Sequence, residues 1–422
     1  MCLMTAPTRR LFLGAGLVGG AALVAGCSGD DGPDEPAAQP SATSDPLAWD
    51  PEDWDSVRDQ FLLDPGLAQF AAFVLSPHTR LLEAAIAHHR DRLGRDTEDA
   101  LFTGSQNAQA VREAAAAFAG GDASQYALTG STTEGLAMIY GGLTLSPRDE
   151  VLTTTHDFFS TEESLRLLRR RTGAAVRRID LYDDPAQATV DEMVQRVVAA
   201  VTRRTRVVAL TWVHSGTGVR VPVREIAAEL PDRVLLCVDG VHGFAAVDVD
   251  LPDLGCDFLA TGTHKWLFGP RGTGILWGAD WAPLTELVPS FSGPEGPNRL
   301  TPGGYHAFEH QWATKDAFEF MSTIGRARVV ERTVEQATRL KAGLAAMDGL
   351  TLVTPQDPEV SAGIVCVDVD GTLPANAVQD LRTRGVVTSA TPYRTSYLRL
   401  GPSIATSPEQ VDQALAALQE IV

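Results

Sequence analysis

The chain has 422 residues, of which 44% are hydrophobic, and its acidic side chains outnumber its basic ones by 54 to 35. A chain of this length and apolar content can bury a large core, and we expect two domains. The formal net charge of −19, with no basic stripe to offset it, excludes an ordinary nucleic-acid-binding protein, because such proteins need positive charge along the phosphate backbone.

The first 26 residues have the pattern of an export signal. Arg9 and Arg10, followed by Leu11-Phe12-Leu13, match the twin-arginine motif, and residues 11–25 are too few and too weakly apolar to cross a bilayer. Val24-Ala25-Gly26-Cys27 then resembles a bacterial lipobox. We therefore predict a signal peptide over residues 1–26, lipidation of Cys27, and an exported bacterial lipoprotein on the extracytoplasmic face of the cell membrane. An ordinary signal peptide or a buried N-terminal helix is the alternative.

Composition divides the rest of the chain. Residues 27–46 are polar and rich in proline and small side chains, which is typical of a disordered tether. We assign residues 47–310 to an N-terminal segment and a large domain, and residues 311–422 to a small C-terminal domain. Within the large domain, residues 283–308 are rich in proline and glycine, and a loop of this length inside a compact enzyme is usually functional.

Strand and helix patterns alternate regularly from about residue 104 to 278. The strands are near-continuous apolar runs, as expected where helices cover both faces of a sheet, and we predict them at 126–129, 151–154, 207–213, 234–239, 258–261 and 274–277. Helices are predicted at 160–171, where Ser160 and Glu163 match a capping box, and at 190–201. A smaller α/β unit follows residue 318, and its last helix begins at Ser407-Pro408. The pattern predicts a mostly parallel α/β sheet that binds ligands at the carboxyl ends of its strands.

Chemically distinctive side chains follow three of these strands. Thr132 and Thr133 lie in a small-residue turn that opens a helix, Asp239 ends the strand at 234–239, and Lys265 follows the strand at 258–261. Pyridoxal 5′-phosphate (PLP) needs a buried amine for its aldehyde, a carboxylate for its ring nitrogen and a helix start for its phosphate. Each feature also has an ordinary alternative, namely a lysine lying along the surface, a helix-capping aspartate and a common helix start.

Two longer motifs resemble the class V aminotransferase superfamily of fold-type I PLP enzymes. They are Val238-Asp239-Gly240-Val241-His242-Gly243 and Thr263-His264-Lys265-Trp266-Leu267. The second motif, with the later Trp312-Ala313-Thr314-Lys315-Asp316, is most similar to the isopenicillin N epimerase-like branch. The resemblance covers roughly residues 55–422 and implies a homodimer whose subunit has a large, mostly parallel sheet domain and a smaller C-terminal α/β domain.

The resemblance also implies roles for individual residues. Lys265 would bind the cofactor and act as acid and base at the substrate Cα, Asp239 would keep the ring nitrogen protonated, and Arg399 would bind the substrate carboxylate, with Arg394 as its competitor. The other implied cofactor contacts are Thr132, Thr133 and His264 at the phosphate, His242 at the ring hydroxyl, Phe158 stacked on the ring, and Thr314 at the phosphate bound to the neighbouring subunit. Core packing is the alternative for Phe158 and His264. No metal site is expected.

Three departures from the family limit what the resemblance implies. Cysteine desulfurases carry a nucleophilic cysteine before the carboxylate-binding arginine, whereas residues 384–397 contain none, so persulfide chemistry is not expected. Phe158 stands where relatives often have histidine or tyrosine and cannot transfer a proton, so a second base must come from His156, His214 or the partner subunit. Residues 70–75 replace an Asn-x-Gly signature on the substrate side, so the identity of the substrate is not carried over.

The expected function is a PLP-dependent enzyme acting on an amino acid or an amino-bearing small molecule. Racemisation or epimerisation at Cα is the leading reaction, β-elimination such as C–S lysis is second, and transamination is third because it needs a keto-acid supply outside the cytoplasm. A catalytically idle lipoprotein that binds ligands in the old pocket is the alternative from another class. Such a protein would be free to lose Lys265, Asp239 and Arg399, and their presence argues against it.

Overall fold

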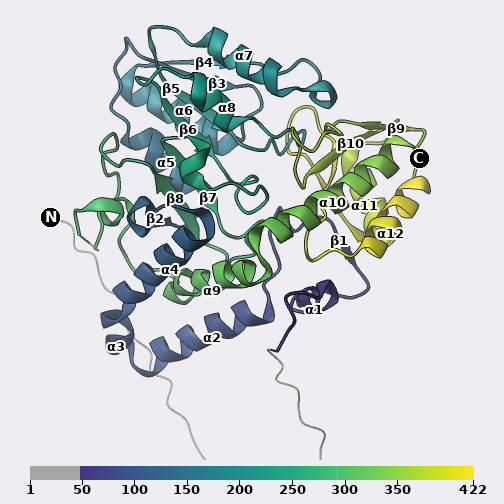
Figure 1. Cartoon of the computed structure of the whole chain (residues 1–422), viewed down its shortest axis with the longest axis horizontal. Coiled ribbons are helices and arrows are strands. Elements are labelled where there is room, and N and C mark those ends of the chain that lie inside the picture. Colours follow the sequence, from purple (N-terminus) through teal and green to yellow (C-terminus); the bar gives the residue numbers. More distant parts are fainter. Residues whose placement is uncertain (1–47, 292) are drawn as a thin grey trace, which may run out of the picture. The chain divides into compact units, whose positions relative to one another are not determined.

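The computed structural model describes residues 48–291 and 293–422, so the predicted signal peptide, Cys27 and the tether lie outside the described residues. The largest element is a seven-stranded sheet in the order β2-β8-β7-β6-β5-β3-β4 (Figure 1). Its strands are β2 (Tyr126–Thr129), β3 (Glu150–Thr154), β4 (Ala175–Ile179), β5 (Thr205–Thr211), β6 (Leu235–Asp239), β7 (Phe258–Gly262) and β8 (Gly274–Gly278). Strands β3 to β7 pair in parallel, and β8 runs antiparallel to both of its neighbours. The mostly parallel α/β sheet is thereby confirmed.

Alternate residues of each central strand enter two hydrophobic clusters, one on each face of this sheet. In β5, Val207 and Ala209 belong to one cluster, and Val208 and Leu210 belong to the other. The first face is covered by α5 (Thr132–Gly142) and α6 (Phe159–Thr172). The second is covered by α4 (Gly104–Ala119), α7 (Val190–Ala200), α8 (Val223–Glu229) and α9 (Phe308–Ile324). Because both faces are covered, the strands are continuous apolar runs in the sequence.

A four-stranded antiparallel sheet, in the order β12-β13-β10-β9, forms the C-terminal part. Its strands are β9 (Leu350–Leu352), β10 (Val365–Val369), β12 (Ser389–Ala390) and β13 (Leu398–Leu400), and the helices beside it are α10 (Arg326–Ala345), α11 (Pro374–Thr383) and α12 (Pro408–Gln419). These elements share a third cluster around Leu340, Leu381 and Val411. Ser407 caps α12 as predicted, because its hydroxyl accepts a bond from the Gln410 N–H at 3.2 Å.

The N-terminal segment consists of α1 (Trp54–Arg58), β1 (Ala68–Gln69), α2 (Arg80–Arg95) and α3 (Thr97–Phe102). Helix α2 packs against α9, whereas β1 pairs in parallel with β11 (Val386–Val387) of the C-terminal part. The segment therefore contacts both parts of the fold. None of the described helices is both long and apolar enough to cross a bilayer.

Two local features differ from the prediction. Strand β4 is not predicted, because this edge strand contains Arg177 and Arg178 and lacks a continuous apolar run. The capping box at Ser160 and Glu163 is wrong, because α6 begins one residue earlier, with Phe158 as its N-cap. The Ser160 hydroxyl instead forms a hydrogen bond with the Thr133 hydroxyl at 2.9 Å, which links the starts of α5 and α6.

Candidate active site

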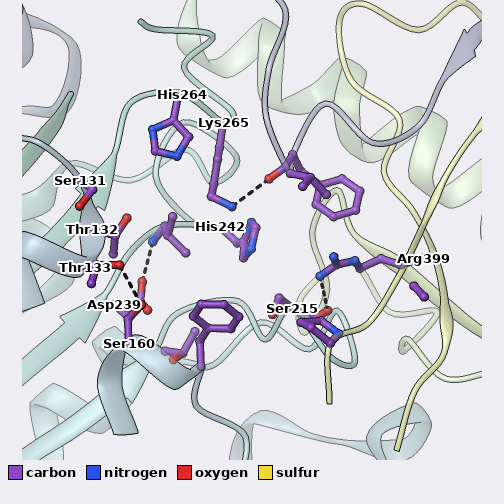
Figure 2. A pocket seen from close by; sticks show the side chains of 17 residues that line it. Ser131, Thr132, Thr133, Ser160, Ser215, Asp239, His242, His264, Lys265 and Arg399 are labelled. Carbon is purple, nitrogen blue, oxygen red and sulfur yellow. Dashed lines mark hydrogen bonds between the residues drawn. The ribbon is translucent and has the colours of Figure 1, made fainter. Parts of the chain in front are cut away.

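A cavity of about 400 Å³, here called the Lys265 cavity, lies at the carboxyl edge of the large sheet (Figure 2). Its lining comes from the ends of β5, β6 and β7, the starts of α5 and α6, residues 73–74, and the C-terminal part. The predicted residues that it brings together are Thr132, Thr133, Phe158, Asp239, His242, His264, Lys265 and Arg399. Of the cofactor and substrate contacts predicted among the described residues, Thr314 lies outside this cavity, as do the alternative candidates His156, His214 and Arg394.

Lys265 reaches the cavity from a short loop after β7. The loop is closed by the Gly269 N–H, which donates to the Thr263 carbonyl at 2.8 Å, and it is anchored by the buried Trp266. The Lys265 Nζ donates to the Phe73 carbonyl at 3.1 Å. Burial, with a smaller contribution from the Arg399 charge, lowers the pKa of this amine to about 8 against the opposing effect of the Asp239 carboxylate. The neutral, nucleophilic form of this amine is therefore reached at a lower pH than in an ordinary lysine.

The chain has three lysines, and only Lys265 is placed for covalent chemistry. Lys315 lies in α9 and pairs with Glu319 at 2.6 Å. Lys341 is buried and donates to the carbonyls of Pro355 and Gln356 and to the Ser361 hydroxyl, which uses all three of its N–H donors. Neither of these lysines lines the Lys265 cavity.

Asp239 is the last residue of β6, and its side chain is almost fully buried, with 1% exposed. Its carboxylate accepts one bond, from the Val241 N–H at 3.1 Å, and has no ion-pair partner among the described residues. Burial, helped by the Asp157 charge and opposed by the Val241 N–H and Lys265, raises the pKa of this carboxyl to about 7. A buried carboxylate with spare acceptor capacity calls for a cationic N–H donor.

The start of α5 gathers unpartnered polar atoms. Ser131 is the N-cap, and its hydroxyl accepts a bond from the Glu134 N–H at 3.2 Å. The Thr132 hydroxyl and the His264 Nδ1 are buried and have no hydrogen-bond partner among the described residues. A helix start with free donors beside it binds anions, phosphate in particular. The Nδ1 of His242, which also lines the cavity, is likewise buried without a partner among the described residues.

Arg399 enters the cavity from β13. Its NH1 donates to the Ser215 carbonyl and its Nε to the Ser389 hydroxyl, both at 3.0 Å, and its guanidinium carbon lies 4.8 Å from the centre of the Phe73 ring. No acidic partner neutralises it among the described residues, so its charge is available to a carboxylate. Arg394 is exposed and lines a separate cavity. This placement favours Arg399 over Arg394 for the substrate carboxylate, and the role stays a prediction.

Three other predicted residues lie outside the Lys265 cavity. Thr314 is 2% exposed within α9, and its hydroxyl donates to the His310 carbonyl at 3.1 Å, so its position offers no exposed hydroxyl to another subunit. His156 stacks on Tyr182 with ring centres 4.2 Å apart, and the His214 Nδ1 is 3.0 Å from the Tyr182 hydroxyl. Both histidines line the cavity of Arg394, which does not support either as the second base.

Asp157 was not singled out from the sequence, although it organises the site. Its carboxylate accepts bonds from the Thr153 hydroxyl at 2.7 Å, the Thr154 N–H at 2.8 Å and the Thr211 hydroxyl at 2.7 Å. It therefore ties the ends of β3 and β5 together directly before Phe158. A signal was available, since an aspartate three residues after a strand ending in threonines can accept bonds from those threonines.

Comparisons with known proteins agree with this geometry. Residues 82–397 match the family model described as aminotransferase class-V. The chain is 28% identical over 400 residues to an isopenicillin N epimerase of Streptomyces clavuligerus, covering 87% of this chain and 98% of that protein. It is also 28% identical over 264 residues to a probable cysteine desulfurase of Pseudomonas aeruginosa, covering 59% of this chain and 64% of the relative.

Solved structures share the fold over nearly the whole described chain. An apo cysteine desulfurase from Thermococcus onnurineus NA1 superposes with a TM-score of 0.77 at 17% identity, covering 87% of this chain and 98% of that one. A C-DES mutant with glycine covalently linked to its PLP cofactor gives 0.79 at 19% identity, covering 86% and 99%. Fold and site together define a fold-type I PLP-dependent enzyme. Within that class, the chain belongs to the class V aminotransferase family.

The residues of the cavity fit PLP on features of this structure alone. The unpartnered Thr132 hydroxyl and His264 nitrogen suit the phosphate, and the unpaired Asp239 carboxylate suits the protonated ring nitrogen. Lys265 suits the aldehyde, and Phe158 lines the cavity where a ring can stack on it.

Proposed function

We propose that this enzyme racemises or epimerises an amino acid, or an amino-bearing small molecule, at Cα. The observation that carries the proposal is the sequence similarity along 98% of an isopenicillin N epimerase, against 64% of the probable cysteine desulfurase of Pseudomonas aeruginosa. A second epimerase, from Amycolatopsis lactamdurans, is 27% identical over 339 residues and is covered to 83% of its length.

The thiols of the chain support the same choice. Cys237, Cys256 and Cys366 are buried, with at most 3% exposed, and no cysteine is among the residues that line the Lys265 cavity. Burial raises the pKa of each thiol, which disfavours the nucleophilic thiolate. The described residues therefore offer no thiol that could accept sulfur from a substrate.

The side chains of the cavity divide the work of moving a proton at Cα. Bound PLP supplies an electron sink for the electron pair that remains when the Cα proton leaves. Arg399 would hold the substrate carboxylate in its planar fork and so orient the Cα–H bond. The neutral Lys265 amine would take the proton, while Phe73, Val74 and Phe158 keep bulk water away.

Inversion needs a proton donor on the other face of Cα. Lys265 and Ser215 lie on opposite sides of the cavity (Figure 2). The Ser215 hydroxyl is 2.6 Å from the Tyr393 hydroxyl, and burial raises the pKa of that phenol to about 12, which keeps it protonated. We assign the donor role to this hydroxyl pair, with Tyr393 supplying Ser215 and regaining its proton from solvent.

β-Elimination is the second candidate, supported by the 28% identity to a probable cysteine desulfurase. It shares the first proton removal and differs by expelling a β-substituent. Purified enzyme incubated with amino-acid pools in heavy water separates the reactions. An epimerase places deuterium at Cα of an otherwise unchanged amino acid and yields both configurations. Release of pyruvate or ammonia, or formation of a keto acid, without a deuterated enantiomer would overturn the proposal, and the Lys265→Ala variant provides the blank.

Two further proposals concern the assembled enzyme. We propose a homodimer, as is typical of the family, and an exported lipoprotein held at the extracytoplasmic face of the membrane through Cys27. The second proposal rests on the sequence alone, because Cys27 lies outside the described residues.

A further inference from the structure

We infer that the substrate has a long side chain ending in an anionic hydrogen-bond acceptor, and that a second cavity beside the Lys265 cavity binds this end. The second cavity, here called the Arg394 cavity, has a volume of about 420 Å³. The inference rests on the proposed action at an amino-acid Cα and adds the class of side chain that the enzyme takes.

The two cavities share a wall that is one residue thick. Ser215 lines the Lys265 cavity and its neighbour Gly216 lines the Arg394 cavity; Pro392 and Tyr393 divide in the same way. Because consecutive Cα atoms are about 3.8 Å apart, the two cavities approach each other closely at both of these points. The Tyr393 ring forms the main partition, since it lies 3.0 Å from where a Cβ on Gly216 would stand and its hydroxyl contacts Ser215.

The substrate's amino-acid end is brought directly to this wall. Arg399, which would bind the α-carboxylate, donates to the Ser215 carbonyl. The Lys265 cavity must hold the cofactor as well as the amino-acid backbone within about 400 Å³, so a long side chain has to leave it. Tyr393 stands at this wall, where one side-chain hydrogen bond and ring packing hold it.

His214, which lines the Arg394 cavity, has a buried ring nitrogen without a partner among the described residues. His214 is 1% exposed, and its Nδ1 pairs with the Tyr182 hydroxyl, which in turn contacts the Thr217 hydroxyl at 2.9 Å. Its Nε2 is buried and has no partner among the described residues. When Tyr182 donates to Nδ1, Nε2 carries the proton of the neutral ring and offers it to an acceptor. Buried polar atoms are normally satisfied, so this nitrogen indicates a ligand group beside it.

Of the two permanently charged side chains that line the Arg394 cavity, the one without an ion-pair partner among the described residues is the cation. The acidic lining residue, Asp183, is paired with Arg196 at 2.8 Å, whereas Arg394 has no ion-pair partner among the described residues. Burial lowers the pKa of both His156 and His214, which disfavours their charged forms. A carboxylate would therefore meet Arg394 as an unopposed cation.

The loop that carries Arg394 is held in place at its base. The Thr391 N–H donates to the Tyr397 carbonyl, and the Tyr397 N–H donates to the Thr391 hydroxyl, both at 2.9 Å. Tyr393 and Arg394 therefore project from a closed loop, with the partition and the free cation side by side.

The test uses the holoenzyme and a length series of α-amino dicarboxylic acids, from aspartate to 2-aminosuberate, with the matching ω-amides. The readout is the rate at which the Cα hydrogen exchanges in heavy water, which any PLP-dependent reaction at Cα produces. We expect kcat/KM to rise with chain length, and the longest acids to exceed their amides by about fivefold, as for one accessible ion pair. Equal rates for all lengths, or no preference for the acid over the amide, would overturn the inference.

Variants test the two polar groups separately. Arg394→Gln should remove the preference for long acids over their amides and leave the rates with short amino acids unaffected. The control is Arg224→Gln, because Arg224 is an exposed residue of α8 that lines neither cavity; this variant should change none of the rates. His214→Asn places an amide near the Nδ1 position and removes Nε2, so it should lower kcat/KM for long substrates selectively. His214→Gln, whose longer side chain places its amide nearer the Nε2 position, should lower it less. Cofactor absorbance and melting temperature report whether each variant is folded and loaded.

If the enzyme prefers long acids but only eliminates or transaminates its substrates, the proposed subsite is supported and the proposed epimerisation is contradicted.

Discussion

At the scale of single residues, burial acts on Lys265 and Asp239 in the same sense, because it disfavours the charged form of each. The pKa of the amine falls to about 8 and that of the carboxyl rises to about 7. Without cofactor, a neutral amine is therefore accessible at mildly alkaline pH. A protonated ring nitrogen would return Asp239 to its anionic form.

The rate of PLP attachment to cofactor-free protein should follow the neutral fraction of Lys265. Because the folded pKa is lowered, the rate should rise with pH through about 8 and then level off, rather than near the ordinary value of 10.5. Stopped-flow absorbance measures this rate. Arg399→Gln should move the midpoint upward, since the Arg399 charge helps to lower the pKa. A wild-type rate that still climbs steeply above pH 10 would contradict the assignment.

Arg399→Ala should weaken the binding of carboxylate-bearing substrates by about 2–5 kcal/mol while cofactor occupancy stays intact, because a desolvated charge-assisted pair is lost. Titration of the holoenzyme with an amino acid, followed by cofactor absorbance, measures the change. Arg399→Lys keeps the charge but loses the planar fork, and it should recover only part of the affinity. If Arg394→Ala weakens short amino acids and Arg399→Ala does not, the α-carboxylate is bound by Arg394.

At the scale of elements, the buried Asp157 carboxylate links the ends of β3 and β5. Asp157→Ala should destabilise the protein by about 3–5 kcal/mol, because it leaves buried threonine hydroxyls and an N–H without an acceptor. Chemical denaturation measures the loss. Asp280→Ala, at an exposed carboxylate that accepts one local bond, should stay within about 0.5 kcal/mol of the wild type. If the two variants unfold with the same free energy, Asp157 does not stabilise the fold as proposed.

The sequence predicts the central strands well because each is a covered apolar run that ends in a polar residue. That same pattern brought Thr132, Asp239 and Lys265 to one edge of one sheet. It could not predict β1, since a pair of two-residue strands more than 300 positions apart carries no local signal. The sequence also could not predict that His156 and His214 line the Arg394 cavity and not the Lys265 cavity, because this depends on the direction in which each side chain points from the wall between the two.

At the scale of the whole molecule, export should depend on the two N-terminal arginines. Changing Arg9 and Arg10 together to lysine should leave the protein in the cytoplasm, because the twin-arginine pathway reads that pair. Cys27→Ser should leave it exported without a lipid. Cell fractionation and lipid labelling measure both outcomes. Normal membrane recovery of the double-lysine variant would contradict twin-arginine export.

The central claim is that the cavity formed by Lys265, Asp239 and Arg399 holds the cofactor and does the chemistry. Borohydride reduction of the holoenzyme, followed by peptide mapping, tests it most directly, because the chain has only three lysines. We expect a single reduced cofactor adduct, on Lys265, and none in Lys265→Ala. An adduct on Lys315 or Lys341, or no adduct after the wild-type protein has been loaded with PLP, would contradict it.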